Sequence, residues 1–85
     1  MAGAFVLLNC KENQEKEVIV QLKEVPQVKE TQCIVGPYDV LVKVEAPTIE
    51  ELHEVITWQI RKIKNVRSTY ILKINEEATD CKDDN

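Results

Sequence analysis

The stretch that decides the fold is Val35-Gly36-Pro37-Tyr38-Asp39-Val40, because it joins two strand-like runs. Gly36 can adopt positive φ without a Cβ clash, and Pro37 fixes φ at about −65°, so both residues favour a turn. The turn directs Tyr38 and Asp39 outward from a hairpin tip. Two interpretations stay open: a strand-entry Tyr beside an Asp that bonds its own backbone, or a corner that contacts a small ligand or another subunit.

The segments around this turn predict the architecture. Residues 28–35 and 38–46 alternate in polarity as the two strands of a hairpin, and residues 3–10 and 66–74 are two further strands. Residues 14–25 and 49–63 repeat apolar side chains at helical spacing, and Thr48 with Glu51 forms a capping box before the second helix. The order β-α-β-β-α-β predicts an α+β, ferredoxin-like fold, with an antiparallel sheet in the order 4-1-3-2 and both helices on one face.

The strand at 3–10 is apolar on both alternating sets, which indicates that both of its faces are covered. With Phe5, Val40, Val42 and Leu72 facing the helices, the opposite sheet face would carry Val6, Leu8, Leu41 and Ile71. A second copy of the sheet is the simplest cover for that face. We therefore expect a homodimer, joined sheet to sheet or through sheet edges that continue into a barrel, and symmetry allows a higher ring. Trp58 lies nearly opposite the apolar stripe of the second helix and is a further candidate contact.

Length and charge exclude several classes of protein. The chain has 85 residues, enough for one domain, and its net charge of −4 argues against a nucleic-acid-binding surface. No run approaches the roughly 18 apolar residues of a membrane span, and the start lacks the basic segment of a secretory signal. We expect a domain at residues 1–75 and a solvated acidic tail at 76–85.

The cysteines favour a reducing, cytoplasmic setting. Cys10, Cys33 and Cys81 form an odd set without the regular spacing of a disulfide framework. Cys10 and Cys33 are expected to be small apolar residues of strands, and Cys81 a free surface thiol.

A longer pattern runs from Gly36 to Val44, continues in Glu50-Glu51-Leu52 and Ile60, and closes in the run from Val66 to Leu72. This pattern resembles the effector domain of the Lrp/AsnC family of regulators over roughly residues 4–75. It departs slightly in the last strand, where Lys73 interrupts the apolar tail. Because the chain begins directly at the first strand, without the family's helix-turn-helix, the resemblance implies a stand-alone domain of the type called RAM, for regulation of amino-acid metabolism. Such a domain is expected not to bind DNA directly.

The resemblance implies a non-catalytic role in sensing a ligand and in assembly. Family members bind small amino acids or related metabolites in clefts between the dimers of a ring, often an octamer. The residues that match the border of this cleft are Gly36, Tyr38, Asp39, Ser68 and Thr69. Asp39 would pair with an α-ammonium, and Gly36 would let the backbone approach a carboxylate closely. The resemblance also suggests a full-length DNA-binding relative as a partner.

Two other functions stay open. Small dimeric barrels of this topology include enzymes, but the chain offers one histidine, His53, and no nucleophile–base pair or phosphate loop, so we expect neither catalysis nor a cofactor. Metallochaperones of the same topology carry CxxC in the first loop, whereas this loop holds Cys10 alone.

Overall fold

The structure is a computed structural model of the whole chain and describes residues 2–74, apart from the side chains of residues 73 and 74. The elements follow one another as β1 (Ala2–Cys10), α1 (Glu15–Lys23), β2 (Val28–Cys33), β3 (Val40–Ala46), α2 (Ile49–Val55), η1 (Ile56–Ile60) and β4 (Val66–Ile74). The predicted order of strands and helices is confirmed. The tail expected at 76–85, with Cys81, lies outside the described residues.

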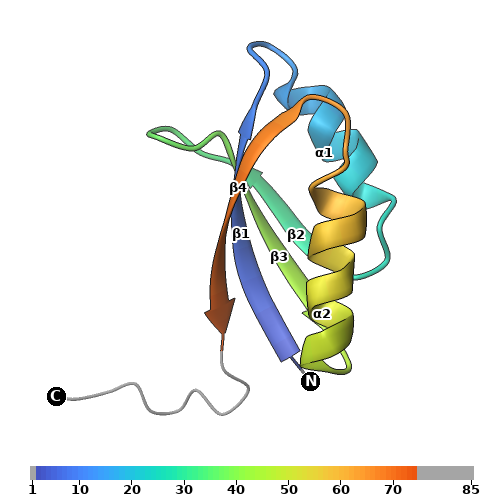
Figure 1. Cartoon of the computed structure of the whole chain (residues 1–85). Coiled ribbons are helices and arrows are strands. Elements are labelled where there is room, and N and C mark those ends of the chain that lie inside the picture. The colour runs from blue at the N-terminus through green and yellow to red at the C-terminus, as the bar shows by residue number, and fades with distance from the viewer. Residues whose placement is uncertain (1, 75–85) are drawn as a thin grey trace, which may run out of the picture.

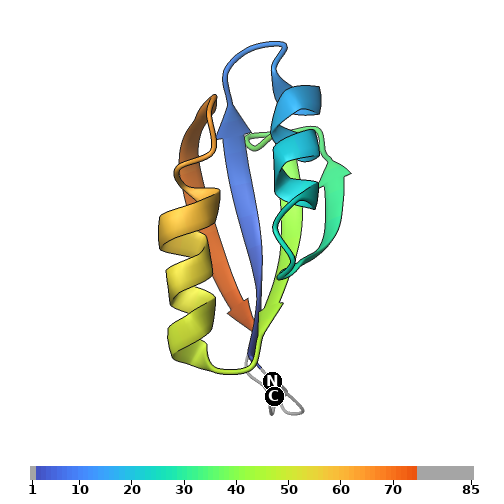
Figure 2. The same cartoon turned by 90° about the vertical axis from the view of Figure 1, so that its right-hand side faces the viewer.

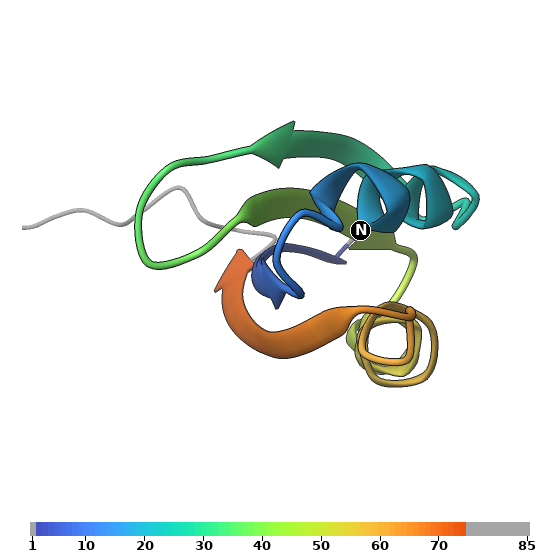
Figure 3. The ribbon, with the colours of Figure 1, turned by 90° about the horizontal axis from the view of Figure 1, so that it is seen from above.

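The four strands form one antiparallel sheet in the order β2-β3-β1-β4, which confirms the predicted 4-1-3-2 arrangement. Both helices lie on the same side of this sheet (Figures 1 and 2). The other side carries no helix in residues 2–74, and the loop between β2 and β3 extends toward that side (Figures 1 and 3). We call this helix-free side the open face. No described helix is long and apolar enough to cross a membrane.

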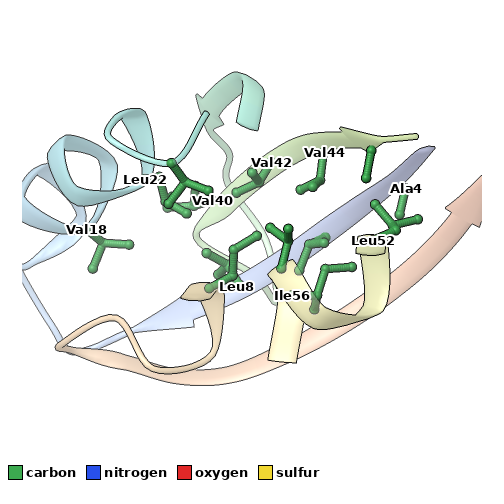
Figure 4. Packing of buried hydrophobic residues seen from close by; sticks show 14 of the residues in the cluster. Ala4, Leu8, Val18, Leu22, Val40, Val42, Val44, Leu52 and Ile56 are labelled. Atoms are coloured by element: carbon green, nitrogen blue, oxygen red, sulfur yellow. The ribbon is translucent and has the colours of Figure 1, made fainter. Parts of the chain in front are cut away.

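The core lies between the sheet and the two helices (Figure 4). Because β1 and β3 pair in antiparallel register, Ala4 faces Val44, Val6 faces Val42 and Leu8 faces Val40. Cross-strand partners share a face of the sheet, so these rows of small and branched side chains form one continuous floor. The helices cover it with a buried set that comprises Val18, Leu22, Leu52, Val55, Ile56 and Ile60.

The second helix begins where the capping box predicts. The Glu51 N–H donates to the Thr48 hydroxyl oxygen at 3.1 Å, which satisfies one of the free backbone donors at this helix end. The helix changes to a π-helical turn at Ile56, where the Arg61 N–H donates to the Ile56 carbonyl at 2.9 Å, and the helical segment ends at Ile60 rather than Ile63. Trp58 in this turn is 61% exposed, as its position on the helix predicted.

The predicted side of the sheet is wrong for three of the proposed contact residues. Val6 and Leu8 are completely buried under the helices, and Ile71, which pairs with Val6, packs against the same core. Leu41 does lie on the open face. The remaining apolar side chains of that face are Phe5 and Leu7 of β1 together with Tyr70 and Leu72 of β4.

A β-bulge explains why the side of β4 could not be read from alternation. Ser68 pairs with Asn9, but Val66 pairs with Cys10, so Arg67 is an extra residue between two register pairs. One inserted residue reverses which side chains face the core beyond it. Val66 therefore packs against the core before the bulge and Ile71 packs against it after the bulge. In a strand without a bulge, an odd sequence separation such as theirs would put the two side chains on opposite faces.

Candidate ligand-binding corner

The corner begins at the loop between β2 and β3. The strands stop short of the predicted turn by two residues on each side, so the loop runs from Ile34 to Asp39. Gly36 has φ +137°, a conformation that L side chains rarely adopt, and Pro37 has no N–H to give to a sheet ladder. The Ile34 N–H donates to the Asp39 carbonyl at 2.9 Å and closes the loop.

Asp39 ties this loop to the end of β1 through both its backbone and its side chain. Its N–H donates to the Leu8 carbonyl at 2.9 Å, and its Oδ2 accepts from the Cys10 N–H, also at 2.9 Å. The bond to Cys10 is charge-assisted and partly buried, and it lies at the bulge of β1 and β4. The interpretation of Asp39 as a turn residue that bonds its own backbone is therefore wrong, because its carboxylate bonds the backbone of β1.

A hollow of about 480 Å³ lies at this corner and is lined by Asn9, Cys10, Asp39, Arg67 and Ser68. Its volume falls within the range of small-molecule sites. The Asn9 Nδ2 donates to the Ser68 hydroxyl at 3.2 Å, which joins β1 to β4 in the lining of the hollow. The hollow thus combines an acidic group, a basic group and neutral hydrogen-bonding groups, the set that a zwitterionic ligand would pair with.

Only two of the predicted ligand-binding residues line this hollow, Asp39 and Ser68. Tyr38 stacks on Tyr70 with ring centroids 6.1 Å apart, on the open face rather than in the hollow. An added Cβ on Gly36 would meet no atom within 4 Å, so Gly36 shapes the loop and touches no wall. Thr69 pairs with the buried Leu8 and therefore points to the helix side of β4.

The sequence interpretation missed Asn9 and Arg67. Asn9 is the one amide in the otherwise apolar stretch 4–10, which was a usable signal for a polar site at the end of that strand. Arg67 gave no signal of its own, because a single Arg within an alternating strand is the ordinary pattern of a solvated face. It lines the hollow because it is the inserted residue of the bulge.

The cysteines differ in their surroundings. Cys10 is buried, and Cys33 is exposed at the end of β2, so the expectation of a packed apolar residue holds only for Cys10. Burial of the thiol, followed by the nearby Asp39 carboxylate, raises the pKa of Cys10 from 9.0 to about 11. Residues 2–74 bring together no group of three or more His, Cys, Asp or Glu side chains that would hold a metal ion.

Residues 3–79 match the family described as the Lrp/AsnC ligand binding domain. The chain belongs to the Lrp/AsnC family. It is 35% identical, over 69 residues, to the uncharacterized HTH-type transcriptional regulator PF0250 of Pyrococcus furiosus, in a match that covers 78% of this chain and 46% of that protein. It is also 40% identical, over 67 residues, to a homocitrate synthase of Sulfurisphaera tokodaii, in a match that covers 78% of this chain and 14% of that enzyme. This Lrp/AsnC chain thus spans about half the length of the regulator and a seventh of the enzyme.

Solved structures of Lrp/AsnC proteins share this fold. The crystal structure of FFRP-DM1 superposes with a TM-score of 0.83 at 37% identity, and the match covers 86% of this chain and 97% of that one. The complex of the regulator NMB0573 from Neisseria meningitidis with L-Met superposes with a TM-score of 0.79 over 91% of this chain and 51% of that one. At 11% identity, the second likeness shows the fold alone.

Proposed function

We propose that this Lrp/AsnC domain senses an amino acid or a related small metabolite, and that it performs no catalysis on the ligand. The observation that carries the proposal is the presence of Asp39 and Arg67 in one hollow. Oδ2 of Asp39 is engaged by the Cys10 N–H, and no other hydrogen bond to this carboxylate is present within residues 2–74. Its second oxygen would accept from an α-ammonium, while the Arg67 guanidinium would pair with the α-carboxylate.

The relatives support a regulatory role for the ligand. The matched part of PF0250 belongs to an HTH-type regulator, and the matched part of the homocitrate synthase is 14% of a much longer enzyme. A domain that accompanies both a DNA-binding unit and a catalytic unit fits a portable sensor better than an enzyme in its own right.

The second part of the proposal concerns assembly. Phe5, Leu7, Leu41, Tyr70 and Leu72 leave an apolar surface on the open face, with Tyr70 52% and Leu72 43% exposed. We infer that a second copy covers this surface sheet to sheet. Pairs then associate into a ring such as an octamer, and a full-length DNA-binding relative can enter the same assembly. The odd cysteine count, without the regular spacing of a disulfide framework, favours a cytoplasmic setting.

The test is thermal unfolding of the full chain against a panel of the common amino acids, with the assembly mass followed by light scattering. We expect at least one amino acid to raise the midpoint, and we expect Arg67→Gln and Asp39→Asn to weaken that rise at equal protein concentration. Glu54→Gln, an exposed acid on α2, serves as the matched control. A panel that leaves both midpoint and mass unchanged in the wild-type chain would remove the sensing role.

A further inference from the structure

The end of η1 and the loop that follows it form a basic segment in an otherwise acidic chain. Residues 61–67 carry Arg61, Lys62, Lys64 and Arg67 and no acidic residue, whereas the whole chain has a net charge of −4. All of these side chains are exposed. We call residues 61–67 the basic loop.

The helix dipole accounts for only part of this charge. Cations are stabilising within the last turn of a helix, which explains Arg61 and Lys62 directly after η1. Lys64 lies beyond that turn. The loop after β1 does not neutralise the charge of the basic loop. The Lys11 N–H donates to the Asn65 carbonyl at 2.8 Å, which brings the loop after β1 beside the basic loop, but the charges of Lys11 and Glu12 cancel each other.

Trp58 marks the edge of the basic loop. Its ring is mostly exposed, and the Lys62 Nζ lies 4.4 Å from the ring centroid, close enough for a cation–π contact. Trp58 is also the only tryptophan of the chain. Its fluorescence therefore reports on what approaches the basic loop.

The sequence provides an oppositely charged segment. Residues 76–84 contain the acids Glu76, Glu77, Asp80, Asp83 and Asp84 against a single base, Lys82. They follow β4, which starts at the basic loop and runs to the opposite end of the sheet (Figures 1 and 2). We call residues 76–84 the acidic segment.

The distance from the end of β4 to the basic loop decides which chain the acidic segment contacts. β4 has nine residues, so at about 3.3 Å per residue its end lies roughly 26 Å from the basic loop. Within one chain, only Asp83 and Asp84 would reach the basic loop, and only with the segment almost fully extended. In a symmetric pair whose β4 strands run in opposite directions, each acidic segment starts beside the partner's basic loop.

We propose that the basic loop is a docking surface for the acidic segment of a second copy of this chain. The contact is electrostatic and exposed, so it depends on salt: the screening length falls from about 8 Å at physiological ionic strength to about 3 Å at 1 M. While the segment is docked, the basic loop is shielded from other anions. The acidic segment thus links chains of the assembly and keeps the basic loop from nonspecific contact with polyanions.

The experiment uses Trp58 as donor and Cys81 as the site of a dansyl acceptor. Acceptor chains carry Trp58→Phe and Cys33→Ser, since Cys33 is exposed and Cys10 is buried. Donor chains are unlabelled and keep Trp58. Donor and acceptor chains are mixed and left to exchange, so any quenching of Trp58 arises between chains. We expect quenching at low salt that falls at least fivefold at 1 M salt.

Charge variants separate this contact from general proximity in an assembly. Arg61→Gln with Lys64→Gln in the donor should remove most of the quenching, whereas the matched pair Lys23→Gln with Lys29→Gln, at exposed lysines elsewhere, should leave it intact. Equal quenching in both donors would overturn the proposal, and so would quenching that occurs only when Trp58 and the label share one chain.

Single-stranded DNA is the probe for shielding of the basic loop. It should bind the full chain more tightly after Asp80→Asn, Asp83→Asn and Asp84→Asn, and equal affinity would also overturn the proposal.

Discussion

Replacing Asp39 by Ala removes the side chain that fastens the loop from Ile34 to Asp39 onto the end of β1. In the wild-type chain, Oδ2 of Asp39 accepts the Cys10 N–H at 2.9 Å in a partly buried position. Asp39→Ala leaves that N–H without its acceptor, because no methyl group can replace a carboxylate oxygen. Asp39→Asn keeps an oxygen at the same place and loses only the charge.

The expected cost follows from that single bond. Leaving a buried donor unsatisfied costs about 1–3 kcal/mol, and because this donor is partly exposed we expect a cost of about 1.5 kcal/mol. For a domain of this size, 1 kcal/mol shifts the unfolding midpoint by about 4–8 °C, so we expect Asp39→Ala to unfold about 6–12 °C below wild type. The unfolding midpoint of Asp39→Asn should lie roughly halfway between those of Asp39→Ala and wild type, since hydrogen bonds to charged groups are about twice as strong as neutral ones.

The assay is thermal unfolding by circular dichroism at one fixed protein concentration, because any self-association makes the midpoint concentration-dependent. Amide hydrogen exchange by NMR reads the bond directly: the Cys10 N–H should lose protection in Asp39→Ala, whereas amides at the centre of β1 should not. Glu54→Ala on the exposed side of α2 is the control and should stay within about 0.5 kcal/mol of wild type. If Asp39→Ala unfolds with the wild-type midpoint and the Cys10 amide stays protected, Asp39 does not hold this corner together.

The other predictions address the helix cap, the thiol, the open face and a strained loop residue. Thr48→Ala should cost about 1 kcal/mol in thermal unfolding and Thr48→Ser almost nothing, because the hydroxyl caps Glu51. Since the pKa of Cys10 is raised to about 11, the folded chain keeps a proton between pH 9 and 11 that the unfolded chain releases. Stability should therefore fall across that window in urea titrations, and Cys10→Ala should flatten the fall. Leu7→Asp should lower the assembly mass in light scattering yet leave a folded chain, whereas Val6→Asp should unfold it; the reverse result would contradict the assigned faces. Asn65 has φ +76°, so Asn65→Ala should cost about 1–2 kcal/mol in thermal unfolding and Asn65→Gly clearly less.

Much of the fold could be predicted because its local signals agree with one another. The capping box at Thr48, the two helical repeats and the turn at Gly36 each favoured the same order of elements, and that order has few solutions for a single antiparallel sheet. The face of β1 could not be predicted, because both of its alternating sets are apolar. Its pairing with Val40, Val42 and Val44 assigns Val6 and Leu8 to the core.

The candidate site could be predicted only in part. Asp39 stood out because the turn does not need it, and Ser68 came from the family resemblance. Arg67 and Asn9 could not be placed from spacing, since they come together only through the register of β1 and β4, which are far apart in the sequence. A residue whose role depends on register carries no local signal.

The bulge separates the two halves of the proposed function along β4. Beyond it, Tyr70 pairs with Leu7 and Leu72 pairs with Phe5, which places both side chains on the open face where a second copy would pack. At the bulge itself, the inserted Arg67 lines the hollow together with Asp39, whose carboxylate is fixed to the Cys10 N–H. Deleting Arg67 would leave Val66 and Ser68 as neighbours that still pair with Cys10 and Asn9, so Tyr70 and Leu72 should stay on the open face while the hollow loses its basic group. Ligand binding should therefore be lost in the deletion variant at an unchanged assembly mass, and Arg67→Gln should weaken ligand binding in the same way. A deletion variant that loses its wild-type assembly mass would mean that the bulge itself is needed for the face of β4 that partners meet.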